Sequence, residues 1–293
     1  MQASPLPTID VSAVLLQSND TAAADTLVVG AVLALAAIAA ALIAACGWWR
    51  IPSAVLGRRP ADPVIHVLAA SVVYLAGSLG ILASQASDDP AYARLSVAVL
   101  GNLMQCALAL AFMFHLTRPA ETPARPLRSA VIAGVVGFLL LTPLTMATSI
   151  AVNELLVLLG LPRAPKASHA TLALLVERRD PLLTSLTLAH VALLVPLAEE
   201  LLWRGMVQPA LRALAGPWAA IGATTALFVL IHWSAIAPEG RAAGLAMIAV
   251  LALGLGVLRE RTGSVAAPVL LHALFNAANV AIALSEKPVS STP

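Results

Sequence analysis

Long apolar runs that contain no charged residue are the feature that most constrains how this chain can fold. Eight stretches lack Asp, Glu, Lys and Arg, namely residues 26–49, 63–87, 95–117, 129–153, 181–198, 213–238, 242–258 and 262–285. A bilayer core of ~30 Å is crossed by about 20 helical residues, because backbone polar groups must be satisfied within the segment. Only 11% of the chain is charged and 60% is hydrophobic, which is untypical of a soluble domain. The sequence predicts an all-α fold, a polytopic membrane bundle of about eight transmembrane helices.

The fifth run stays apolar beyond the point where its charges begin. Apolar residues follow Glu199 and Glu200 as far as Leu211. We therefore expect one helix, kinked near Pro196, that carries both carboxylates at depth and ends at Gly216.

The remaining segments are short and polar. We expect residues 1–25 to form a polar N-terminal leader, residues 26–285 a single transmembrane domain, and residues 286–293 a short polar tail. Ten of the Lys and Arg residues fall on one side of these spans and seven on the other, which favours an N-terminus outside the membrane. The excess of Arg over Lys is typical of a bacterium with a GC-rich genome, so we expect an integral protein of a bacterial plasma membrane. A net charge of +2 without a basic cluster indicates no nucleic-acid partner.

The C-terminal third concentrates polar side chains within apolar segments. A charge at mid-bilayer costs about 2.5–3.5 kcal/mol on insertion scales, so such residues usually pair or take part in chemistry. The residues concerned are Glu199, Glu200, Arg204, His232, His272 and Asn276.

Helical spacing assigns different roles to the two adjacent carboxylates. Glu200 and Arg204 are four residues apart on one helix face, so they are expected to form an ion pair. Glu199 points about 100° away around the helix. An apolar setting and a neighbouring negative charge both increase the proton affinity of a carboxylate, which suits a general base for water.

The two histidines each share a helix face with a second candidate. His272 and Asn276 are four residues apart and can both donate hydrogen bonds to one developing oxyanion. Phe228 and His232 have the same spacing. A Glu and a His from different helices, with a His/Asn pair opposite, would form a hydrolytic site for an amide.

Structural interpretations of the same residues remain open. On a soluble helix this Glu-Glu-Arg pattern would be a solvated face, and a single intramembrane His or Asn is more often an interhelical hydrogen-bond partner. The alternative functions are a non-catalytic membrane immunity factor or scaffold and a proton-coupled transporter. Glu199→Gln distinguishes an enzyme from a scaffold, because it preserves shape but removes the base.

Three motifs resemble those of a known family. EELLWRG fits E-E-x-x-x-R, FVLIH fits F-x-x-x-H and HALFN fits H-x-x-x-N, in the order found in the CPBP family of intramembrane proteases. That family includes the CAAX prenyl endopeptidases and the bacteriocin-processing or self-immunity (ABI) proteins. The resemblance covers about residues 180–285 and implies an endopeptidase that acts on a peptide or membrane-protein substrate in the lipid bilayer.

The resemblance also implies roles for individual residues. Glu199 and His232 would activate the attacking water, and His272 and Asn276 would stabilise the oxyanion. Glu200 and Arg204 would shape the site, with Phe228 in support.

We expect no cofactor, because the HExxH zinc motif is absent. Zinc is the alternative, with Glu199, His232 and His272 as its ligands. The expected helix ends would separate His232 and His272 by roughly 10 Å along the membrane normal, an offset that helix boundaries or tilt must absorb.

Overall fold

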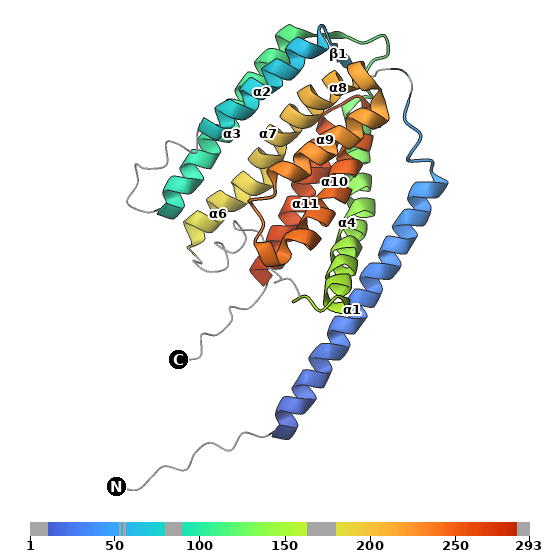
Figure 1. Ribbon diagram of the computed structural model, residues 1–293, viewed down its shortest axis with the longest axis vertical. Coiled ribbons are helices and arrows are strands. Elements are labelled where there is room, and N and C mark those ends of the chain that lie inside the picture. Colours follow the sequence, from blue (N-terminus) through green and yellow to red (C-terminus); the bar gives the residue numbers. More distant parts are fainter. Residues whose placement is uncertain (1–10, 53, 55–56, 80–89, 163–179, 286–293) are drawn as a thin grey trace.

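Residues 11–52, 54, 57–79, 90–162 and 180–285 are described by a computed structural model (Figure 1). The α-helices are α1 (Val11–Ala45), α2 (Pro63–Leu79), α3 (Pro90–Leu116), α4 (Leu127–Leu158), α6 (Pro181–Ala189), α7 (Val195–Leu202), α8 (Gln208–Ala215), α9 (Pro217–Ile231), α10 (Arg241–Thr262) and α11 (Ala266–Ser285). The π-helical segments η2 (His190–Leu194) and η3 (Trp203–Val207) join α6, α7 and α8 into one continuous helix, and a 3-10 turn, η4 (Pro238–Gly240), precedes α10. The fold is helical, as predicted, and α1 begins within the expected polar leader.

Helix length and surface character fit a membrane protein. Five helices in the described part of the chain are long and apolar enough to cross a bilayer, and three shorter ones, α2, α9 and α11, are also apolar. Large apolar side chains cover the outside of the bundle; Phe114 and Leu158, for example, are 75% and 83% exposed. An outer surface of this kind suits contact with lipid rather than water.

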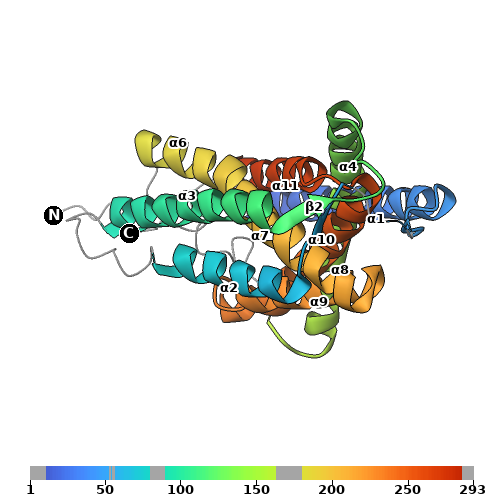
Figure 2. The same cartoon turned by 90° about the horizontal axis from the view of Figure 1, so that it is seen from above.

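The helices form a bundle (Figures 1 and 2) in which α4 and the continuous helix α6–α8 each pack against several other helices. Helix α4 packs against α1, α10 and α11, while α2 pairs with α3 and α3 packs on α7. Small residues allow the closest approach, because a Cβ on Gly134 of α4 would lie 2.8 Å from the carbonyl oxygen of Ala267 in α11. This close contact holds the last helix beside α4.

A short β-ribbon departs from the all-helical prediction. Strands β1 (Arg58–Pro60) and β2 (Thr117–Pro119) pair antiparallel before α2 and after α3. Arg59 and Arg118 lie directly opposite each other in this ribbon. The ribbon closes the α2–α3 pair at one end of the bundle.

The π-helical segment η2 lies just before Pro196, where the sequence predicts a kink. The Val195 N–H bonds to the carbonyl of His190, five residues back. The Val191 carbonyl would normally accept from Val195, and its π-helical partner would be Pro196, which has no N–H. The Val191 carbonyl is therefore left without a backbone partner inside its helix.

The second π-helical segment, η3, repeats this arrangement. The Gln208 N–H bonds to the Trp203 carbonyl, and Pro209 follows. The carbonyl of Arg204 thus loses both of its possible backbone partners. Each proline leaves one backbone acceptor that another part of the molecule must satisfy.

The sixth predicted span, 213–238, is longer than the helix found there, α9. The continuous helix before it ends at Ala215, as expected from Gly216 and Pro217, and Gly216 adopts a positive φ of 83° that allows the turn into α9. Helix α9 ends at Ile231, so His232 caps its C-terminus and is not a mid-helix residue. Hydropathy does not detect this end, because apolar residues such as Trp233 and Ile236 continue into the loop.

Candidate active site

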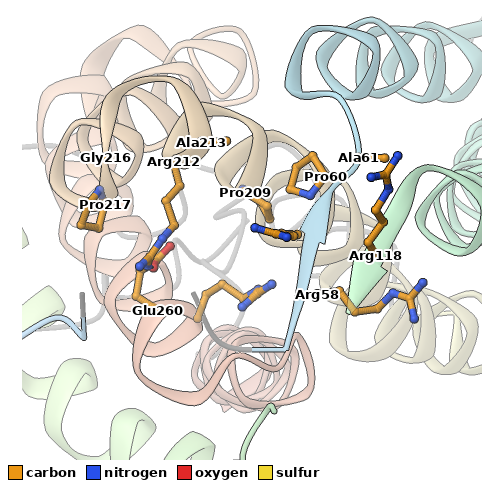
Figure 3. A pocket seen from close by; sticks show the side chains of 12 residues that line it. Arg58, Pro60, Ala61, Arg118, Pro209, Arg212, Ala213, Gly216, Pro217 and Glu260 are labelled. Atoms are coloured by element: carbon orange, nitrogen blue, oxygen red, sulfur yellow. The ribbon is translucent and has the colours of Figure 1, made fainter. Parts of the chain in front are cut away.

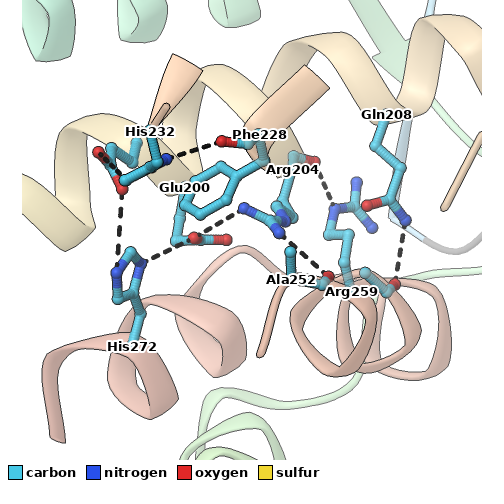
Figure 4. Close-up of polar contacts among 10 residues, drawn as sticks. Glu200, Arg204, Gln208, Phe228, His232, Ala252, Arg259 and His272 are labelled. Atoms are coloured by element: carbon cyan, nitrogen blue, oxygen red, sulfur yellow. Dashed lines mark hydrogen bonds and ion pairs between the residues drawn. The ribbon is translucent and has the colours of Figure 1, made fainter. Parts of the chain in front are cut away.

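Glu199 meets two imidazole rings that come from different helices, those of His232 and His272. Figure 4 shows these two histidines near Glu200, Arg204 and Phe228. Its Oε1 atom lies 3.9 Å from His232 Nε2, and its Oε2 atom lies 3.8 Å from His272 Nε2. The three residues come from α7, the end of α9 and α11. Both histidines reach Glu199, so the offset implied by the expected helix ends does not separate them, and the expected convergence of these three side chains is found.

The other nitrogen of each ring is already occupied. His232 Nδ1 lies 2.7 Å from the Phe228 carbonyl oxygen, and His272 Nδ1 lies 3.0 Å from Glu200 Oε1. A carbonyl oxygen or an ionised carboxylate can only accept, so both rings carry the proton on Nδ1. In its neutral form each ring then presents the lone pair of Nε2 to Glu199. The Glu199 carboxylate and the two Nε2 atoms are then all hydrogen-bond acceptors. A donor such as water, placed between them, would satisfy them.

Adjacent carboxylates occupy different environments. The Glu199 side chain is 19% exposed, whereas Glu200 and Arg204 are fully buried. The predicted ion pair is present, since Arg204 donates to Glu200 Oε1 at 2.9 Å. Arg204 also donates to the Ala252 carbonyl at 3.1 Å. Only the first of the two glutamates is accessible to a reactant.

Phe228 packs the aromatic groups of the site together. Its ring centroid is 4.6 Å from that of His232 and 6.2 Å from that of His272. The Arg204 guanidinium carbon lies 4.9 Å from the same centroid, and Trp203 meets the ring edge-on. This side chain is 1% exposed, so it holds the two imidazoles in place by packing. The motif did not identify Trp203.

Asn276 has a hydrogen-bond partner that the sequence did not predict. Its side-chain amide donates to the carbonyl of Val191 at 3.0 Å, the acceptor that Pro196 leaves without a backbone partner. An amide nitrogen has two hydrogens, so one donor remains for a second acceptor. The contact places Asn276 beside the helix that carries Glu199.

A polar ladder extends from the site along the interface between the continuous helix and α10. Gln208 donates to the Gly256 carbonyl at 3.0 Å and to Glu260 Oε1 at 2.8 Å, and Arg212 forms an ion pair with Glu260. Arg259 Nε donates at 2.9 Å to the Arg204 carbonyl, the second acceptor left free by a proline. The sequence interpretation did not include Gln208, Arg259 or Glu260 among the site residues.

A signal for this ladder was present in the sequence. Glu200, Arg204, Gln208 and Arg212 recur every four residues, which places them on one helix face. The partners on α10, Arg259 and Glu260, could not be predicted, because the sequence does not show that α10 faces this helix.

The arrangement does not define a metal centre. Within the described ranges, no three side chains of His, Cys, Asp or Glu are grouped so that they could hold a metal ion. The zinc alternative, with Glu199, His232 and His272 as ligands, therefore stays a prediction.

The fold and the site define a helical bundle of the membrane type with a buried carboxylate–imidazole cluster. Residues 181–278 match the family described as type II CAAX prenyl endopeptidase Rce1-like, and the chain contains a domain of this family. This confirms the resemblance seen in the three motifs. No curated protein and no solved structure matches the chain. A domain of this family indicates an intramembrane protease.

Proposed function

We propose that the chain is an intramembrane endopeptidase that hydrolyses a peptide bond with a water activated by Glu199 and His232. The observation that carries the proposal is that two imidazole Nε2 atoms face one carboxylate at 3.8 and 3.9 Å. These separations exceed a direct hydrogen bond of 2.7–3.2 Å. One water can lie within hydrogen-bond distance of both Glu199 and His232, donating a proton to each.

The reaction then proceeds by general acid–base catalysis. Glu199 takes a proton from the water as its oxygen attacks the carbonyl carbon of the substrate. The resulting oxyanion accepts hydrogen bonds from His272 Nε2–H and from the second hydrogen of the Asn276 amide. The C–N bond then breaks, and the proton held by Glu199 moves to the leaving amine.

Glu200 supports this role for His272. To donate from Nε2 while Nδ1 also carries a proton, the ring must be an imidazolium. The Glu200 carboxylate at 3.0 Å would stabilise that form, and Arg204 donates to the same carboxylate oxygen at 2.9 Å. The buried pair is therefore a positioning and charge-balancing element.

A purely structural role fits Glu199 less well. Its carboxylate is 19% exposed and faces two imidazole nitrogens at 3.8 and 3.9 Å, whereas the buried Glu200 and Glu260 are each paired with an arginine. A glutamate that only locked helices together would be expected to have such a partner. This difference favours an enzyme over a scaffold.

The test is peptide cleavage by purified protein in liposomes. The probes are a quenched fluorescent farnesylated CAAX peptide and the same peptide without the prenyl group, so that the lipid requirement is measured separately. Membranes that contain wild-type or variant protein are also compared by sequencing new N-termini, which identifies other substrates.

Glu199→Gln should lower the cleavage rate by about 10²–10⁴-fold, the usual contribution of a general base. The control is Glu121→Gln, which makes the same change at an exposed site between β2 and α4. Wild-type turnover by Glu199→Gln would show that the proposal is wrong.

A further inference from the structure

A second polar site lies at the end of the bundle where β1 and β2 meet α8, α9 and α10 (Figure 3). The cavity has a volume of about 510 Å³, within the range of ligand pockets. At ~1.5 Å per residue, Arg212 lies roughly 20 Å along the helix from Glu199, so this cavity is separate from the catalytic cluster. Five arginines but a single carboxylate, Glu260, line it.

The carboxylate neutralises only one of these arginines. Glu260 pairs with Arg212, and both side chains are nearly buried. Arg58 donates to the side chain and backbone of Thr117, neither of which carries charge. Among the described residues, Arg59, Arg118 and Arg259 form no ion pair with a carboxylate. The cavity therefore has a strong excess of positive charge.

Two of these unpaired charges face the cavity from the β-ribbon. Arg59 and Arg118 are directly opposed in the antiparallel register, so both side chains leave the same face of the ribbon. Like charges at directly opposed positions destabilise a strand pair. An anion between them would turn this repulsion into attraction.

The inner wall also favours an anion. Arg259 lines the cavity while being only 8% exposed, and its only hydrogen bond within the described residues uses Nε. Helix α9 begins at the cavity with Gly216 and Pro217, and no side chain caps its N-terminus. Such a terminus carries a partial positive charge and uncapped N–H groups. Buried guanidinium groups and a helix N-terminus are the usual donors to phosphate oxygens.

From these observations we propose that the cavity binds the phosphate group of an anionic phospholipid headgroup. The ends of apolar helices lie at the level of the headgroups, and basic pockets between such ends bind anionic lipids. The exposed guanidinium groups of Arg59 and Arg118 form the rim, and Arg259 lies at the inner wall. This site is independent of the proposed peptidase function.

Lipid binding by the full-length protein in neutral detergent tests the proposal. Native mass spectrometry with dioctanoyl phosphatidylglycerol, dioctanoyl phosphatidylcholine and inorganic phosphate as separate probes gives the dissociation constant of each. Phosphatidylglycerol should bind at least about tenfold more tightly than phosphatidylcholine, whose choline cation the arginines repel. Equal affinities for these two lipids would overturn the proposal.

The double variant Arg59→Gln/Arg118→Gln should weaken phosphatidylglycerol binding by at least about tenfold. The control Arg50→Gln/Arg128→Gln removes two charges from the same end of the bundle without touching the cavity, and it should bind as the wild type does. Wild-type binding by the first variant, or equal loss in both, would overturn the assignment. Inorganic phosphate that binds as tightly as the lipid would identify free phosphate as the ligand and overturn the lipid proposal.

Loss of binding through misfolding is tested separately. Because Arg59→Gln/Arg118→Gln removes a repulsive pair, its thermal unfolding temperature without lipid should equal or exceed that of the wild type. A lower unfolding temperature would show that these arginines stabilise the ribbon themselves and would contradict the proposal.

Discussion

The side-chain amide of Asn276 donates to the backbone carbonyl of Val191, an acceptor that has no backbone partner available in its own helix. Arg259 Nε likewise donates to the Arg204 carbonyl, which also lacks a backbone partner in its helix. In both places a proline follows a π-helical segment, and a side chain from α10 or α11 completes the hydrogen bonding. The helix that carries Glu199 therefore depends on the last two helices for its backbone geometry.

Asn276→Leu should lower the free energy of unfolding by about 1–3 kcal/mol, because a partly buried carbonyl loses its donor. Unfolding in SDS measures this loss. Adding Pro196→Ala supplies a backbone N–H inside the same helix and should recover part of the stability. If Asn276 also stabilises the oxyanion, peptide cleavage stays low in the double variant; recovery of cleavage would show that the residue only supports the helix.

Arg204→Met should be strongly destabilising, by about 3–5 kcal/mol, because Glu200 is left buried without its cation. The double variant Glu200→Gln/Arg204→Met removes both charges and should be less destabilised than Arg204→Met alone. A double-mutant cycle that also includes Glu200→Gln measures the coupling energy by SDS unfolding. A double variant whose destabilisation equals the sum of the two single effects would show that the pair is not coupled.

Gln208→Leu should cost about 1–3 kcal/mol of stability, since Gln208 alone bridges the Gly256 carbonyl and Glu260. Glu260 keeps its ion pair with Arg212, so the bundle should remain folded. The loss is measured by SDS unfolding. An unchanged free energy of unfolding would mean that the ladder contributes no net stability.

Gly134→Ala should destabilise the bundle by about 1–3 kcal/mol, because the new methyl group would lie 2.8 Å from the backbone oxygen of Ala267. The matched control is Gly222→Ala in α9, where a Cβ meets nothing within 4 Å. That change should be neutral or stabilising by about 0.5–1 kcal/mol. Thermal unfolding of the two variants in detergent compares them directly, and similar shifts would contradict the close packing of α4 on α11.

Treatment with 1,10-phenanthroline followed by dialysis should leave cleavage by the wild-type protein unchanged, as a metal-free mechanism predicts. Metal content is measured on the same sample. Activity that is lost on chelation and restored by zinc would instead support Glu199, His232 and His272 as zinc ligands.

Local sequence patterns predicted the parts of the structure that depend on one helix at a time. The apolar runs located the eight apolar helices in the described part of the chain, and the four-residue spacing of Glu200 and Arg204 predicted their ion pair. The grouping of Glu199 with His232 and His272 also followed from the rarity of polar residues in apolar helices. The catalytic roles assigned to these residues stay predictions.

Features that depend on contacts between helices were not predictable in this way. Hydropathy could not show that α9 ends before His232, because the loop after it is also apolar. The partner of Asn276 depends on a π-helical segment whose formation involves tertiary contacts. The β-ribbon is too short for a sequence signal, and the Gln208–Glu260 contact requires knowing that α8 lies beside α10.

The two proline-linked segments have a consequence for synthesis of the protein. The ribosome synthesises the helix that carries Glu199 before α10 and α11. Until those two helices are made, the carbonyl oxygens of Val191 and Arg204 lack their hydrogen-bond donors. The two donors, Arg259 and Asn276, arrive only with these last helices. A nascent chain therefore cannot assemble its reactive cluster before nearly all of it has entered the membrane.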